Sequence, residues 1–128
     1  SNELWRATLE TLDFVPFTNA SYSGGVLITD WFSSEETKNN ISRELKITVR
    51  FLSNEIRADG LEVNIHEKIC EMDKVGCSIK KIKTGLESEI KLAILKKATI
   101  LEKNTMKKNS KERKKKTSWK GKDQKGKN

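Results

Sequence analysis

The segment GGVLITDW, residues 24–31, joins two glycines to a run of β-forming residues that ends in a carboxylate beside a tryptophan. Val, Ile and Thr are enriched in strands, so VLITDWF, residues 26–32, is predicted to be a β-strand. The glycines suit a position with positive φ or a β-bulge ahead of it. Because successive strand residues face opposite sides, two sets are expected on opposite faces: Val26, Ile28 and Asp30 against Leu27, Thr29 and Trp31.

Asp30 raises the question of catalysis. A hydrolytic site would need a second carboxylate, or a nucleophile with its base, near Asp30. The chain has one histidine, His66, which strand alternation places on a polar face, and it has no nucleophile-elbow or phosphate-loop motif. We therefore expect Asp30 to be structural, with Trp31 as a packing anchor. It either caps the turn after the strand or accepts hydrogen bonds from an arginine, the candidates being Arg43, Arg50 and Arg57.

The rest of the chain predicts an α+β fold. Apolar residues at helical spacing over residues 4–12 predict a helix that Pro16 ends. Residues 45–51 and 61–69 alternate apolar and polar side chains, as in an antiparallel sheet with one solvated face. A short strand at 77–82 and a helix at 85–103 follow. We expect an antiparallel sheet of three to four strands packed against an N-terminal and a C-terminal helix.

Two cysteines, Cys70 and Cys77, flank a predicted hairpin turn symmetrically. Directly opposite residues on adjacent strands are close enough for a disulfide. The same spacing fits two reduced thiols. A metal site is not expected, because a C-x6-C pair with one distant histidine matches no common ligand spacing.

Basic charge is concentrated at the C-terminal end. Residues 103–128 hold 12 Lys/Arg and 2 Asp/Glu, a net charge of +10, whereas the whole chain carries +8. Met106 and Trp119 are their only large apolar residues, too few to offset the entropy lost on ordering. This predicts a folded domain at residues 1–102 and a disordered lysine-rich tail at 103–128. Candidate contacts of the tail with nucleic-acid phosphates or an anionic membrane surface are Lys114, Lys115, Lys116 and Trp119.

Three stretches carry a family resemblance: LWRATLETLDFVP (4–16), GGVLITDWFS (24–33) and LKITVRFLSNEIRADGLEVNIHEK (45–68). In this order they resemble an uncharacterised family of proteobacterial envelope lipoproteins, over about residues 4–102. A more distant similarity to the repeated domain of the β-barrel assembly lipoprotein BamC implies a helix-grip-like α+β fold. The residues on motif positions are Trp5, Arg6, Gly24, Gly25, Thr29, Asp30, Trp31, Arg57, Ala58 and Asp59.

The resemblance implies a non-enzymatic, periplasm-facing or outer-membrane lipoprotein domain that binds or scaffolds an unidentified envelope protein. We expect no catalytic residue, cofactor or metal. The lipobox cysteine of the family is absent here, so lipid attachment is an inference about a longer precursor. An oxidising envelope favours the Cys70–Cys77 disulfide over free thiols. The alternative function is nucleic-acid binding through the basic tail.

Overall fold

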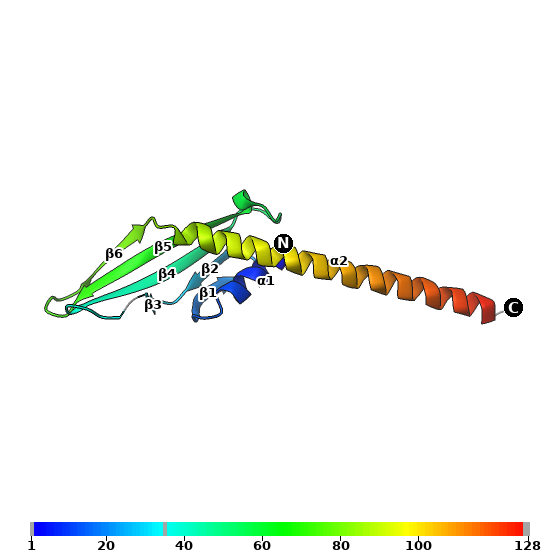
Figure 1. Ribbon diagram of the computed structural model, residues 1–128, viewed down its shortest axis with the longest axis horizontal. Coiled ribbons are helices and arrows are strands. Elements are labelled where there is room, and N and C mark those ends of the chain that lie inside the picture. Colours follow the sequence, from blue (N-terminus) through cyan, green and yellow to red (C-terminus); the bar gives the residue numbers. More distant parts are fainter. Residues whose placement is uncertain (1, 35, 127–128) are drawn as a thin grey trace.

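The protein is an α+β fold with one antiparallel sheet and two helices (Figure 1). The computed structural model describes residues 2–34 and 36–126, with side chains described for residues 3–34 and 36–117. The elements in chain order are α1 (Asn2–Thr11), β1 (Phe17–Ser21), β2 (Val26–Thr29), β3 (Phe32–Ser33), β4 (Ile41–Phe51), the 3-10 turn η1 (Ala58–Gly60), β5 (Leu61–Glu71), β6 (Cys77–Ile82) and α2 (Leu86–Gly126). The α+β prediction is confirmed.

The sheet has six strands and not three to four. Its order is β1-β2-β4-β5-β6, and β3 also pairs with β4. Strand β1 was not expected because its sequence, FTNAS, has no apolar alternation; it is an edge strand with mostly exposed residues. The other additional strand arises because the expected strand at residues 26–32 is divided into β2 and β3.

A one-residue irregularity separates β2 from β3. Ile28 lies opposite Thr48 and Phe32 lies opposite Leu45, so four steps along β2–β3 match three along β4. One extra residue of this kind is a β-bulge, and it reverses the faces of the residues that follow. The prediction that Trp31 shares a face with Leu27 and Thr29 is therefore wrong.

The core lies between the sheet and the two helices. Strands β4 and β5 alternate as predicted, and the helix-covered side, which we call the inner face, buries their apolar residues. Leu4 and Ala7 of α1 and Ile94 of α2 belong to the same cluster. The Lys97 Nζ of α2 lies 3.1 Å from the Glu10 carboxylate of α1, so the helices are also joined at their surface. The buried apolar residues of the strands are Leu27, Leu45, Ile47, Val49, Leu61, Val63 and Ile65.

A capping box starts helix α2. The Leu86 N–H donates to the Thr84 Oγ1 (3.0 Å), and the Thr84 N–H donates to the Glu87 carboxylate (3.0 Å). This reciprocal arrangement satisfies amide groups that a helix N-terminus leaves without a partner. It fixes where α2 leaves the end of β6.

Helix α2 continues well past the body of the protein (Figure 1). The prediction of a disordered tail is thus corrected for residues 103–126, which are helical; residues 127–128 lie outside the described part. No proline or glycine interrupts the sequence between Leu86 and Lys120. Lysine is a good helix former, and a helix already nucleated on the body can propagate without burying new surface. No helix in the described part of the chain is long and apolar enough to cross a membrane.

Candidate functional site

The T-D-W motif of residues 29–31 forms the bulge between β2 and β3. Thr29 is fully buried, and its Oγ1 accepts the Ile47 N–H at 2.9 Å. A side-chain hydroxyl therefore satisfies a β4 amide beside the irregularity. The Asp30 N–H donates to the Pro16 carbonyl oxygen (2.8 Å), which ties the bulge to the chain before β1.

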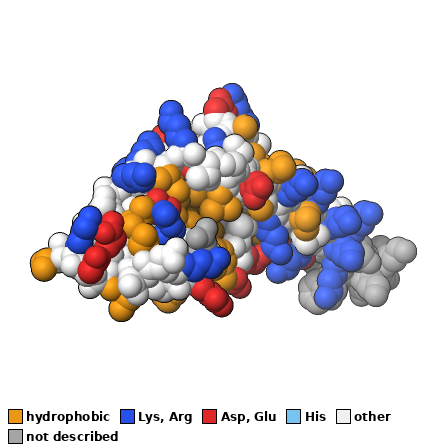
Figure 2. Space-filling model, turned by 60° about the vertical axis from the view of Figure 1, so that its left-hand side comes forward, with side chains coloured by type: hydrophobic (Ala, Val, Ile, Leu, Met, Phe, Trp, Pro, Cys, Tyr) orange, Lys and Arg blue, Asp and Glu red, His pale blue; other side chains and the backbone are white. Residues whose placement is uncertain are grey.

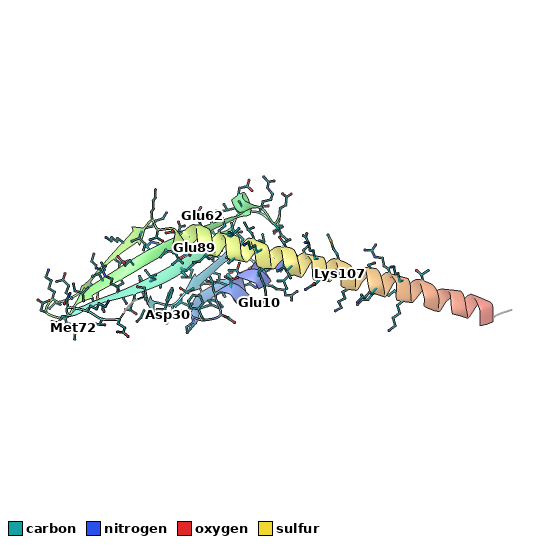
Figure 3. All side chains as sticks on the ribbon, viewed as in Figure 1. Glu10, Asp30, Glu62, Met72, Glu89 and Lys107 are labelled. Carbon is teal, nitrogen blue, oxygen red and sulfur yellow. A yellow bond between two sulfur atoms is a disulfide. The ribbon has the colours of Figure 1, made fainter. Side chains whose placement is uncertain are left out.

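Asp30 is exposed and caps the turn. Its Oδ1 accepts the Trp31 N–H at 2.7 Å (Figure 3 labels Asp30). Among the described residues no arginine forms an ion pair with Asp30, so the arginine-paired alternative is wrong and the turn-capping one agrees with the structure. Nothing in this geometry converges on the carboxylate to act on a substrate.

Trp31 lies on the outer face of the sheet, opposite the helices. The ammonium groups of Lys46 and Lys68 lie 5.0 and 4.8 Å from its ring centroids. The Lys68 Nζ also lies 3.4 Å from the Glu44 carboxylate. Cation–π contacts of this kind hold Trp31 as an anchor of the outer face.

Trp5 and Gly25, from two separate motifs, line one cleft at the end of the sheet. The cleft has a volume of about 420 Å³. The Trp5 ring packs edge-on against Tyr22 (centroids 5.5 Å apart) and at a tilt against Phe51 (5.6 Å). Leu52 forms part of the lining. We call this site the aromatic cleft; its remaining lining residues are the polar Ser23, Ser53 and Asn54.

The two glycines shape the turn that carries Tyr22 into the cleft. Gly25 has a φ of 66°, a region that favours glycine, and its carbonyl accepts the Phe51 N–H at 2.8 Å. The Gly24 N–H donates to the Ser21 Oγ at 3.0 Å. The prediction of a positive-φ position is confirmed for Gly25.

The R-A-D motif forms a local ion pair at η1. The Arg57 guanidinium donates to both Asp59 carboxylate oxygens (3.0 and 2.9 Å) and to Glu55 Oε2 (3.0 Å). The hydrogen bonds to Glu55 and Asp59 raise the pKa of Arg57 above its ordinary value. All three side chains are exposed, and the motif brackets the turn into β5 without lining the aromatic cleft.

Other predicted residues lie apart from the cleft. Arg6 is exposed on α1 and faces a groove with residues 101–112 of α2. Lys114, Lys115 and Lys116 are exposed on α2. Trp119 lies on the helix, but its side chain is outside the described residues. His66 is half-buried on the outer face, opposite Lys46 and Lys81.

Cys70 and Cys77 form a disulfide across the β5–β6 hairpin. They are directly opposite in the register, with Cα atoms 4.4 Å apart. The turn between them uses Gly76 with a φ of 87°. Elsewhere, no three His, Cys, Asp or Glu side chains in the described part of the chain gather as a metal site would require.

Sequence reasoning missed Tyr22, Phe51 and Leu52 as partners of Trp5. Tyr22 stands just before the glycine pair, and Phe51 ends the clear alternation of β4, but no local pattern links these positions. A second cleft of about 300 Å³ lies between α1 and α2, with Phe14 and Phe32 in its lining, and no motif residue lines it. The aromatic cleft is therefore the better candidate site.

Fold and site together describe a small α+β domain with an aromatic cleft at the end of its sheet. The chain belongs to a family described as a domain of unknown function (DUF3576), whose model matches residues 1–103. It is also 36% identical over 66 residues to the uncharacterized protein RP420 of Rickettsia prowazekii (strain Madrid E). That match covers 52% of this chain and 38% of the Rickettsia protein.

Proposed function

We propose that the domain is a non-enzymatic binding module of the cell envelope that holds a protein partner in its aromatic cleft. The observation that carries the proposal is the convergence of the W-R-A and G-G motifs on one cleft through Trp5 and Gly25. Tyr22 and Leu52 are 58% and 61% exposed at the same site. Aromatic anchors of this kind dominate the binding energy of protein interfaces.

The T-D-W motif supports binding over catalysis. The Thr29 Oγ1 and the Asp30 Oδ1 both accept hydrogen bonds from backbone amides at the bulge. The T-D-W motif thus has a structural role, because its side chains stabilise the β2–β3 bulge of the sheet.

Two observations support an envelope location. The Cys70–Cys77 disulfide fits an oxidising compartment, and the three motifs resemble the envelope lipoproteins, with BamC as a more distant likeness. In this proposal a lipid anchor belongs to a longer precursor.

Trapping thiols in intact cells tests the compartment. An alkylating reagent added before lysis should leave Cys70 and Cys77 unmodified, and a reductant should then expose both to the reagent. A protein whose two cysteines are alkylated without reductant would contradict the envelope location.

The size of the protein extracted from its host tests the cleft. The unmodified protein should elute with a partner, at more than its own mass, and a Tyr22→Ser, Leu52→Ser double variant should elute as the free chain. The matched control is Met72→Ser, Val75→Ser, which also removes two exposed apolar side chains but at the hairpin tip. Loss of the partner in both variants, or free elution of the unmodified protein, would overturn the proposal.

A further inference from the structure

The far part of α2 is a basic helix that stands away from the body (Figure 1). We call residues 103–117 the basic extension. All of its described side chains from residue 106 onward are exposed. Figure 2 shows Lys and Arg side chains gathered along this part of the molecule. It contains one acidic residue, Glu112, and one large apolar residue, Met106.

One side of the basic extension carries a row of lysines. Lys103, Lys107, Lys111 and Lys114 follow one another at steps of four, four and three residues, which places them on one side of an α-helix. Glu112 lies on another side, since it lines the groove that faces Arg6 of α1. The row, which we call the basic face, is therefore free of acidic side chains and of the body, and Figure 3 labels Lys107 just beyond the body.

We propose that the basic face docks on the headgroups of an anionic phospholipid surface. Charge complementarity calls for an anionic occupant. With Met106 as its only large apolar side chain, the extension has no apolar stripe with which to enter a bilayer. The contact is therefore electrostatic and stays at headgroup level. The choice of lipid over nucleic acid rests on the proposed envelope location, where phospholipid is the extended anionic surface.

Flotation of the full-length chain with vesicles tests the docking. The protein should float with vesicles that contain phosphatidylglycerol and not with vesicles of phosphatidylcholine alone, and added salt should release it. A Lys107→Gln, Lys111→Gln, Lys114→Gln variant should bind roughly 100-fold more weakly, because each lysine near such a surface contributes about fivefold. Circular dichroism checks that the variant keeps its helix content.

A Lys80→Gln, Lys81→Gln, Lys83→Gln variant is the matched control, since it removes the same charge from exposed lysines of the body. It should float as the parent does. Equal losses in the two variants, equal binding to both kinds of vesicle, or binding to a DNA duplex in salt that abolishes flotation would overturn the proposal. The thiol-trapping experiment tests the envelope location without depending on lipid binding. Failure of lipid docking can therefore be distinguished from failure of the envelope proposal.

Discussion

The side-chain hydroxyl of Thr29 accepts a hydrogen bond from a backbone amide of strand β4, where a regular sheet would use a backbone carbonyl. Its Oγ1 receives the Ile47 N–H at a position with no solvent exposure. This contact joins residues 18 positions apart, so no local sequence pattern could predict it. The contact lies beside the β-bulge between β2 and β3. The extra residue of this bulge turns Trp31 to the outer face and brings Phe32 against the core, so strict alternation along the strand predicts the wrong face for Trp31.

Replacing Thr29 with valine should destabilise the fold while preserving side-chain shape. The Ile47 amide would remain buried without its acceptor, at a cost of about 1–3 kcal/mol in the free energy of unfolding. Denaturant unfolding measures the change. Thr29→Ser is the control, because it keeps the hydroxyl that accepts the Ile47 N–H. A valine variant as stable as the parent would contradict a stabilising role of this hydrogen bond.

Asp30→Ala should have a smaller effect than Thr29→Val. The Trp31 N–H that Asp30 accepts is exposed, so water can replace the carboxylate, and we expect a loss below about 1 kcal/mol. The same unfolding assay applies. A larger loss for Asp30→Ala than for Thr29→Val would reverse this ranking and point to an undetected role of the carboxylate.

At the scale of helices and strands, the sequence predicts those elements whose apolar residues recur with helical or strand periodicity. Strands β4 and β5 and the packed part of α2 lie where their apolar patterns place them. Strand β1 is not predicted by apolar periodicity, because an exposed edge strand needs no buried stripe of side chains. Its hydrogen bonds to β2 define it instead. The part of α2 beyond residue 102 is not predicted for a related reason. A helix can continue on helix propensity alone once its first turns are packed.

The disulfide stabilises the β5–β6 hairpin, the part of the sheet with the most exposed residues. In the chain-entropy account, closing a loop between residues 7 positions apart contributes about 2–3 kcal/mol. A Cys70→Ser, Cys77→Ser variant should lose this amount in denaturant unfolding. Reductant should destabilise the parent and leave the variant unchanged; a parent insensitive to reductant would contradict the prediction.

For the whole molecule, the packing divides the chain near residue 102. The last fully buried side chain of α2 is Ala98, and Leu101 and Glu102 are half-buried. The body therefore holds its core without the basic extension. The charge split at residue 103 indicates this division from sequence alone, whereas the aromatic cleft depends on tertiary contacts between α1, the β1–β2 turn and the end of β4.

Truncation after Glu102 should leave the melting temperature within a few degrees of the parent. The removed residues contribute exposed lysines and one half-buried residue, Thr105, in their described part. Thermal unfolding followed by circular dichroism at matched salt checks this. A truncated chain that fails to fold would show that the body depends on the extension.

Photo-crosslinking from position 22 in living cells tests the binding cleft most directly. A benzoylphenylalanine in place of Tyr22 keeps an aromatic ring at the cleft, and the same group at Met72 places the probe at the hairpin tip near the other end of β4 (Figure 3). We predict one discrete crosslinked protein from position 22, absent from position 72 and lost when Leu52→Ser is added. Equal crosslinking from both positions, or none from position 22, would contradict the account.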